Sequence, residues 1–121
     1  MLYVPLDFEN NHTVDALVDS GAFVSAIAQD DLENIKKKAP NNVLKIDEPP
    51  NFQIQVANGQ LEKPLSTATL KFEIGDNVFA EHFVVMKKIT GPIIGLHFMR
   101  NNSVVIDTTR FHTFSALNKA G

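Results

Sequence analysis

The chain has 121 residues, a formal net charge of −3 at pH 7 and no cysteine. This length suits a single domain spanning residues 1–121, and a hydrophobic content of 44% is enough for a small core. The negative charge argues against nucleic acid as the main partner, because a phosphate-binding surface needs an excess of Lys and Arg. Without cysteine there is no thiol nucleophile, no Cys-ligated zinc ion and no disulfide.

The sequence also favours an intracellular, cytoplasmic protein. The absence of cysteine is consistent with a reducing compartment. No apolar run approaches the roughly eighteen residues that a membrane-spanning helix needs, and no signal peptide precedes the first strand. His12, His82 and His112 do not follow a metal-binding spacing such as His-Glu-x-x-His, so we expect no metal and no other cofactor.

The N-terminal segment is predicted to form two strands that lead into an acidic loop. Apolar and polar residues alternate from Leu2 to Phe8 and again from Thr13 to Val18, with a turn at residues 9–12 between them. Alternation of this kind has the period of half-buried β-strands. The second strand continues directly into Asp19-Ser20-Gly21-Ala22.

Asp19 is the strongest candidate for a functional residue. A carboxylate at the end of an apolar strand destabilises the fold by several kcal/mol if it is buried without a partner, so its presence indicates a role. Gly21 allows a sharp turn and a close approach of the backbone, and the hydroxyl of Ser20 can form a hydrogen bond. Taken alone, this triplet is also compatible with an ordinary surface turn.

The residues after this loop predict a strand followed by a short helix. Residues 23–28 are apolar and extended. Asp30 and Glu33 have the spacing of a capping box at the start of a helix. The three lysines at 36–38 suit the end of that helix, where the helix dipole is negative.

The rest of the chain predicts short strands separated by turns. The strands are expected at 43–46, 52–56, 67–74, 78–86, 104–107 and 111–114, with a frayed tail from 115 to 121. Asn58-Gly59 gives the strongest hairpin signal in the chain. Ile93-Ile94-Gly95 precedes a helical turn at 96–100. Seven or eight short strands with turns between them indicate an all-β barrel.

Two of these stretches together resemble the retropepsins, the aspartic proteases of retroviral type. Retropepsins carry Asp-Thr/Ser-Gly-Ala in the active-site loop, here Asp19-Ser20-Gly21-Ala22. They also carry two apolar residues and a glycine before a short helix, here Ile93-Ile94-Gly95. The separation of the two signatures is similar to that in one retropepsin subunit. The pattern is closest to the proteases of gypsy-type LTR retrotransposons, in which Asp-Ser-Gly-Ala is followed after two residues by a serine, here Ser25.

The resemblance implies a small closed all-β barrel with one or two short helices, which forms one half of a twofold dimer. It also implies an aspartic endopeptidase, active as a homodimer, in which Asp19 activates a water molecule with support from Ser20 and Gly21. Its substrate would be an extended peptide, such as the Gag-Pol polyprotein of a retroelement. The hairpin at Asn58 would be a mobile flap. The residues implied in substrate binding are Ala22, Ala57, Asn58, Gly59, Ile93 and Ile94.

The single copy of the acidic motif also points to a dimer. Aspartic proteolysis needs two carboxylates around one water molecule, one acting as a base and the other as an acid. Asp19-Ser20-Gly21 is the only such triplet, because Asp107-Thr108-Thr109 lacks the glycine. His97 stands where retropepsins usually carry Asp, Asn or Arg, so charge pairing between subunits must differ in this chain.

Two other functions are compatible with the sequence. One is a retropepsin-fold domain that dimerises or binds peptides without cutting them, although an intact Asp-Ser-Gly-Ala argues against a pure scaffold. The other is an unrelated β-barrel binding module in which Asp19 occupies a plain turn.

Overall fold

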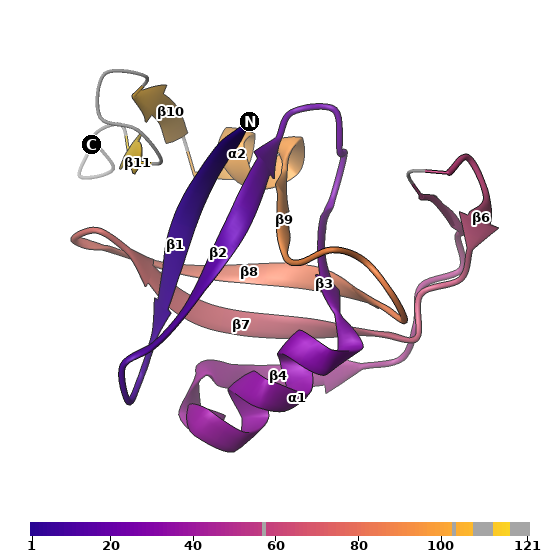
Figure 1. Ribbon diagram of the computed structural model, residues 1–121, viewed down its shortest axis with the longest axis horizontal. Helices are drawn as coiled ribbons and strands as arrows, with labels where there is room; N and C mark the ends of the chain where they lie inside the picture. Colours follow the sequence, from indigo (N-terminus) through magenta and orange to yellow (C-terminus); the bar gives the residue numbers. More distant parts are fainter. Residues whose placement is uncertain (57, 103, 108–112, 117–121) are drawn as a thin grey trace.

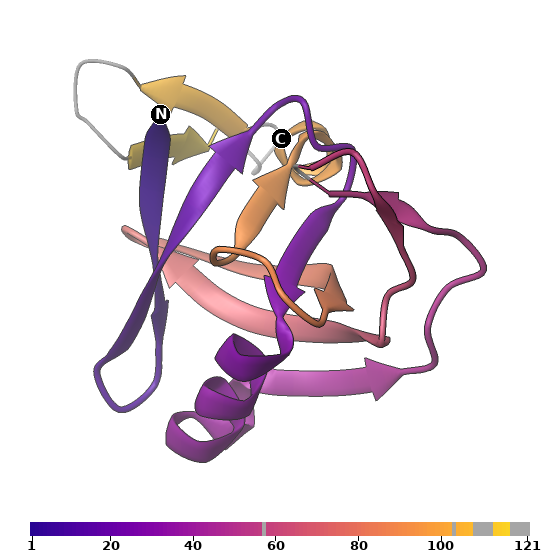
Figure 2. The ribbon, with the colours of Figure 1, turned by 45° about the vertical axis from the view of Figure 1, so that its right-hand side comes forward.

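The computed structural model describes residues 1–56, 58–102, 104–107 and 113–116 (Figures 1 and 2). These residues form one seven-stranded sheet and two sheets of two strands. The strands are β1 (Leu2–Phe8), β2 (His12–Asp19), β3 (Ser25–Ala28), β4 (Val43–Asp47), β5 (Ile54–Gln55), β6 (Leu61–Glu62), β7 (Ser66–Ile74), β8 (Asn77–Met86), β9 (Ile93–Gly95), β10 (Val104–Asp107) and β11 (Thr113–Ala116). The helices are α1 (Gln29–Lys38), the 3-10 helix η1 (Pro40–Asn42) and α2 (Leu96–Asn101).

β1 and β2 form the antiparallel hairpin that the N-terminal alternation predicts. Asn10 and Asn11 make the turn, with φ angles of 58° and 57°. Asparagine tolerates this left-handed conformation, and two such residues in succession give a turn whose twist matches that of the flanking strands. The hairpin therefore ends with Asp19 on the strand that returns from this turn.

Six strands of the large sheet close into a barrel. In the order β1-β2-β9-β3-β8-β7 each strand pairs with the next, and β7 pairs back with β1 through Glu73 and Asp7. β4 extends the sheet beyond β7 and lies outside this ring. With the two short α-helices, this architecture confirms the closed all-β barrel that the sequence predicts.

β9 brings the two sequence signatures together. It lies between β2 and β3, although it comes much later in the chain (Figure 1). It runs parallel to β2, with Gly95 opposite Asp19, and antiparallel to β3, with Ile93 opposite Ala26. The end of β2, where Asp19 lies, is therefore supported from the side by β9.

Phe72 lies at the centre of the main hydrophobic core. Apolar and polar residues alternate along β7, and Phe79, Phe83 and Val85 lie on one face of β8, so one set of side chains from each strand is buried in this core. The ring centroid of Phe72 lies 6.0–6.2 Å from those of four other rings, namely Phe8, Phe79, Phe83 and Phe98. Aromatic pairs at this distance stabilise a core beyond the effect of buried area. Because these rings come from β1, β8 and α2, they join the barrel to the second helix.

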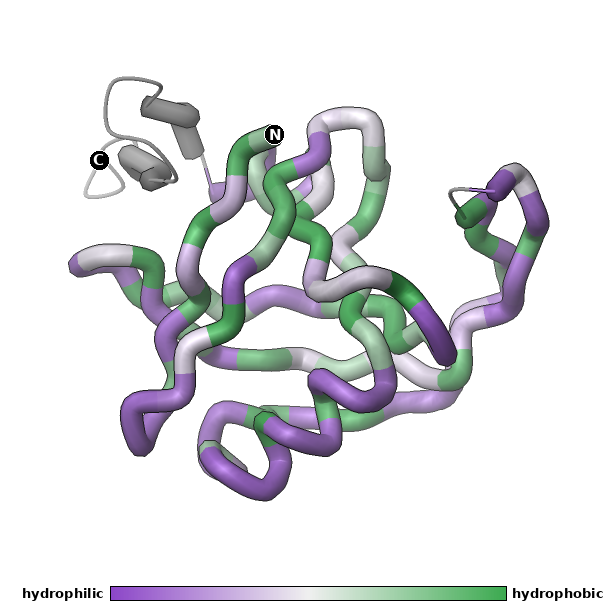
Figure 3. The backbone as a smooth tube through the Cα atoms, in the orientation of Figure 1, coloured by the Kyte–Doolittle hydropathy of each residue, from purple (hydrophilic) through white to green (hydrophobic). Residues whose placement is uncertain are grey.

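The predicted capping box of α1 is wrong, although the helix itself is confirmed. The helix starts at Gln29, and the preceding alanine forms no side-chain cap. Glu33 instead accepts a hydrogen bond from the side-chain amide of Gln29 at 2.7 Å. Most of the helix is hydrophilic (Figure 3), and it packs on the barrel through Leu32 and Ile35, which are fully buried.

β10 and β11 form a separate antiparallel pair near the end of the chain. β11 reaches Ala116, two residues into the segment where the sequence predicts a frayed tail. The start of the predicted last strand, at residues 111–112, and the end of the predicted tail, at 117–121, lie outside the described residues. In the described parts of the chain, no helix is both long and apolar enough to cross a lipid bilayer.

Replacing Asn42 by alanine is expected to lower the free energy of unfolding by about 2 kcal/mol. The buried side chain of Asn42 accepts the N–H of Glu9 at 3.1 Å and donates to the carbonyl of Lys71 at 2.7 Å, so it joins the end of β1 to β7. Alanine would leave both backbone groups without this partner. Urea unfolding of Asn42→Ala, compared with Asn41→Ala at the exposed neighbour, measures the effect. Equal midpoints for the two variants would contradict it.

Candidate active site

Asp19 is the last residue of β2, and its carboxylate is held by its own loop. Its Oδ1 accepts the backbone N–H of Gly21 at 2.9 Å, and its carbonyl accepts the N–H of Ala22 at 3.1 Å. The chain therefore turns immediately after Asp19. The residue is half-buried, whereas Ser20 and Gly21 are exposed. The loop thus presents an oriented carboxylate at the surface of the protein.

Gly21 allows a close approach to this carboxylate. A Cβ atom at position 21 would lie 3.1 Å from Oδ1 of Asp19, which is tighter than an ordinary contact. The φ angle of Gly21 is not among the positive ones in the described chain, so a left-handed turn is not the reason for glycine here. The sequence predicts both a sharp turn and a close approach, and the close approach is the one that requires glycine.

The first turn of α2 holds the segment after Asp19. The N–H of Leu96 donates to the carbonyl of Ala22 at 2.7 Å, and the N–H of His97 donates to the carbonyl of Phe23 at 3.1 Å. The first N–H groups of a helix have no partner inside the helix, so they are free to bind other acceptors. Here they fix two consecutive carbonyls of the Asp19 loop.

His97, which departs from the family pattern, stacks on an exposed phenylalanine. Its ring centroid lies 5.2 Å from that of Phe23, with an angle of 25° between the planes. Phe23 is 65% exposed and precedes β3, so the strand starts two residues later than predicted. An aromatic pair therefore lies at the surface beside the loop of Asp19.

The structure brings part of the predicted substrate-binding set together. Ala22 and Ile93 are half-buried. Ala22 lies in the loop of Asp19, whereas Ile93 lies on β9 opposite Leu17, two residues before Asp19. Ile94, by contrast, is fully buried and belongs to the main core, so its side chain does not reach the surface. Asn58 and Gly59 are exposed at the tip of the β5–β6 hairpin, and Ala57 lies outside the described residues.

The hairpin predicted at Asn58-Gly59 is confirmed. β5 and β6 pair antiparallel, and the N–H of Val56 donates to the carbonyl of Gln60 at 2.9 Å. Gly59 has a φ angle of 86°, which is easily adopted only by glycine. In Figure 1 the hairpin projects from the barrel.

A second apolar cluster lies where this hairpin meets β3 and β8. Ile54 and Val56 of the hairpin, together with two loop residues, pack on three buried side chains of β3 and β8. The cluster consists of Val24, Ala26, Ile54, Val56, Val84, Met86 and Ile89. None of these seven residues is among those predicted to bind substrate. The sequence of β8 does contain a signal for this cluster. Apolar residues occupy both faces near the end of the strand, which indicates that both faces are covered.

A buried polar contact lies behind the Asp19 loop. The hydroxyl of Ser25 donates to Oε2 of Glu81 at 2.8 Å, and Ser25 Oγ accepts the N–H of Gly95 at 3.0 Å. Burial raises the pKa of Glu81 above its usual range. Part of this rise in the pKa is offset by the hydrogen bonds from Ser25 and from the N–H of His82. The nearby imidazoles of His82 and His97 also lower the pKa.

Acidification is expected to stabilise the wild type relative to Glu81→Gln. Because the pKa of Glu81 is higher in the folded than in the unfolded protein, the folded state binds this proton more tightly. The resulting stabilisation is complete below the ordinary pKa of 4.5 and is lost as the pH rises through the folded-state pKa. Urea unfolding of both proteins between about pH 4 and pH 7 measures it. A difference in stability that does not vary with pH would contradict this expectation.

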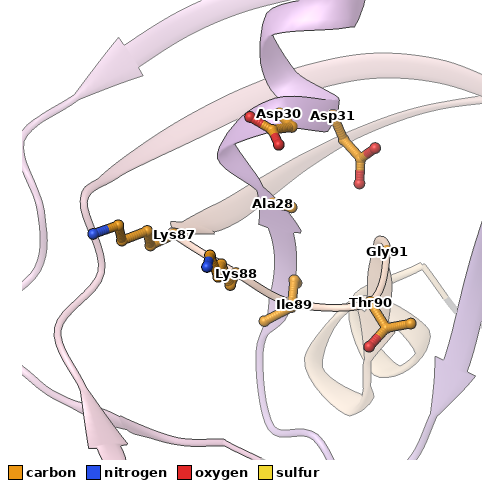
Figure 4. Close-up of a pocket in the computed structure, with 8 residues that line it drawn as sticks. All are labelled: Ala28, Asp30, Asp31, Lys87, Lys88, Ile89, Thr90 and Gly91. Atoms are coloured by element: carbon orange, nitrogen blue, oxygen red, sulfur yellow. The ribbon is translucent and has the colours of Figure 1, made fainter.

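A shallow cavity of about 360 Å³ lies between the start of α1 and the loop that follows β8 (Figure 4). Asp30 and Asp31 line one side, and residues 87–91 line the other, with the side chain of Lys87 pointing away from both carboxylates. None of the predicted site residues lines this cavity, so we assign it no part in the site. Within the described residues, no three side chains of His, Asp or Glu gather closely enough to hold a metal ion.

Solved structures that resemble this chain include the following two. The retroviral protease-like domain of Ddi1 from Leishmania major matches with a TM-score of 0.71 and 20% sequence identity, over 98% of this chain and 89% of that one. The foamy viral protease-reverse transcriptase in complex with an RNA/DNA hybrid matches with a TM-score of 0.49 and 17% identity, over 83% of this chain and 12% of that one. No family model and no curated protein matches the sequence. The likeness to the first structure shows that the fold is retropepsin-like.

Proposed function

We propose that this protein is an aspartic endopeptidase that acts as a homodimer, with Asp19 of each subunit forming the catalytic pair. The observation that carries the proposal is the position of Asp19 at the end of β2 on a retropepsin-like barrel. Its carboxylate is oriented by the N–H of Gly21, and its loop is held by the first N–H groups of α2. A half-buried, oriented carboxylate of this kind suits proton transfer to and from a bound water molecule.

The reaction needs two such carboxylates, and the proposed twofold axis would supply the second. Two carboxylates about 3 Å apart cannot both ionise, so they share one proton. The ionised one takes a proton from water as the water oxygen attacks the peptide carbonyl. The protonated one donates to the carbonyl oxygen. The C–N bond then breaks as the carboxyl that took the proton of water passes it to the leaving nitrogen, while the other carboxylate takes a hydroxyl proton back as the carbonyl forms again, so the pair again holds one proton.

The proposed substrate is an extended peptide with apolar side chains near the cut. The cluster beneath the β5–β6 hairpin consists of aliphatic residues and methionine, which favour apolar side chains. Ile54 and Val56 of the hairpin already pack on the other members of this cluster, as a flap over the peptide would require. The pattern Asp19-Ser20-Gly21-Ala22 with Ser25 supports a retroelement polyprotein of the Gag-Pol type as the natural substrate.

A peptide-binding or dimerisation domain of the same fold that does not cut its ligand is the second candidate. The neighbour from Leishmania major is described as a retroviral protease-like domain, which is compatible with either function. The apolar cluster beneath the hairpin would bind a peptide equally well without chemistry. The oriented carboxylate of Asp19 favours catalysis, because peptide binding alone does not need it.

Cleavage of a mixed peptide library between about pH 4 and pH 7 tests the proposal, because a pair of carboxylates that shares one proton should act in this range. We expect cuts beside apolar residues and a rate per chain that rises with protein concentration as dimers form. Sedimentation over the same concentrations should show the dimer appear together with the activity. A folded dimer that binds peptides but cuts none would favour the second candidate. A fully active monomer would contradict the shared pair.

A further inference from the structure

Glu81 occupies a position on β8 where the pattern calls for an apolar side chain. Side chains two residues apart in a strand lie on the same face, and β8 turns Phe79, Phe83 and Val85 into the main core. Glu81 falls in the same series and is half-buried. A carboxylate in such a place destabilises the fold unless its oxygens are hydrogen-bonded. Its partners should therefore indicate why a glutamate stands here.

Both carboxylate oxygens of Glu81 accept hydrogen bonds. Oε1 accepts the backbone N–H of His82 at 3.0 Å, and Oε2 accepts the hydroxyl of Ser25 at 2.8 Å. Ser25 is 1% exposed and begins β3, which runs parallel to β8. An ionised carboxylate can only accept, so Ser25 must direct its proton toward Glu81 and turn its lone pairs elsewhere.

The oxygen of Ser25 also binds the strand that supports the Asp19 loop. Ser25 Oγ accepts the N–H of Gly95 at 3.0 Å in a buried contact. Gly95 lies opposite Asp19 in the pairing of β2 with β9, and it immediately precedes α2. A chain of hydrogen bonds therefore runs from Gly95 through Ser25 to Glu81. It crosses from β9 to β3 and then to β8.

We propose that Glu81 is a positioning residue for the candidate active site, which it serves through Ser25 by holding Gly95. Gly95 in turn fixes the start of α2, whose first N–H groups bind the carbonyls of the Asp19 loop. In this role Glu81 sets the direction of the Ser25 hydroxyl and takes no part in proton transfer to the peptide. The inference rests on the proposed function, because positioning has a catalytic consequence only if Asp19 cleaves peptides.

The first test follows the backbone amides of Gly95 and Asp19 by NMR in Glu81→Gln and in Ser25→Ala. Glutamine keeps the shape of Glu81 but replaces one acceptor oxygen by a donor, so it can no longer accept from both the Ser25 hydroxyl and the N–H of His82. We expect both amide signals to shift in both variants and hydrogen exchange at Gly95 to accelerate roughly tenfold or more. Glu73→Gln, on the exposed face of β7, is the matched control and should change neither signal.

The second test measures peptide cleavage by the same variants. We expect Glu81→Gln to lower kcat by roughly tenfold to a hundredfold through misplacement of the loop, with KM close to that of the wild type. In the Ser25→Ala background Glu81→Gln should add little, because both residues act through one chain of hydrogen bonds.

Three results would overturn the inference. They are an unchanged Gly95 amide in folded Glu81→Gln, an unchanged kcat in that variant, and fully additive losses in the double variant with Ser25→Ala. A wild type that cuts no peptide would instead overturn the proposed function. In that case the Gly95 amide would still decide whether Glu81 holds the start of α2.

Discussion

Asparagine in place of Asp19 is expected to reduce peptide cleavage by more than about a thousandfold. Asparagine has the shape of aspartate, and its Oδ1 can still accept the N–H of Gly21 that is 2.9 Å away in the wild type. The fold should therefore persist, while the side chain can no longer take up or release the proton that the reaction needs. Initial rates on a cleavable library peptide measure the effect. Asp15→Asn, at an exposed position of the same strand, should keep its rate within roughly twofold of the wild type.

Mixing Asp19→Asn with the wild type tests whether two subunits share one site. If each site needs one Asp19 from each chain, a tenfold excess of the variant captures most wild-type chains in dimers with a single carboxylate. The wild-type rate should then fall roughly tenfold. If one subunit contained a complete site, the wild type would keep its full rate in the mixture. That second result would exclude the shared pair even if Asp19 itself proved essential.

The alternation of apolar and polar residues predicts most of the strands, because every second side chain of a half-buried strand is apolar. The hairpin of β1 and β2 and the long strand β7 follow it closely. The place of β9 could not be predicted in this way, because three residues carry no period and their partner β2 is distant in sequence. Only the resemblance to retropepsins assigns Ile93 and Ile94 to the same site as Asp19.

The same limit appears within the candidate site. Adjacent strand residues point to opposite faces, so only one of Ile93 and Ile94 can face the core. Which one does so depends on the register of β9 against β2 and β3, and this register is not contained in three residues. The structure buries Ile94 fully and leaves Ile93 half-buried.

Glu81 shows a signal that the sequence does contain. A carboxylate in phase with Phe79 and Phe83 predicts a buried acid with hydrogen-bond partners. The identity of the partner could not be predicted, because Ser25 comes from a strand that pairs with β8 in parallel and lies far away in the sequence.

The predicted N-cap of α1 is wrong for a different reason. The helix begins at Gln29, so Asp30 lies inside its first turn and not at the N-cap, and Glu33 binds the side-chain amide of Gln29.

Alanine at position 95 is expected to destabilise the fold by at least about 3 kcal/mol. A Cβ atom at Gly95 would lie 2.6 Å from both the carbonyl carbon and the oxygen of Val24, and 2.9 Å from the carbonyl oxygen of Ala22. These are backbone atoms, which cannot rotate aside as the end of a side chain can. The loop would have to move away from α2, and its hydrogen bonds of 2.7 and 3.1 Å to the helix would lengthen. Urea unfolding measures the loss of stability.

Gly75→Ala is the matched control, because it separates backbone conformation from close packing. Gly75 has a φ angle of 60°, and nothing in the described structure lies within 4 Å of the Cβ position. Alanine there should therefore lower stability by only about 1 kcal/mol, the effect of a left-handed conformation. Gly95 has the opposite combination, with a φ angle of −91° and three backbone atoms closer than 3 Å. Equal stabilities of the two variants would contradict tight packing at Gly95. A folded Gly95→Ala protein that cleaves peptides at the wild-type rate would show that the start of α2 does not position Asp19.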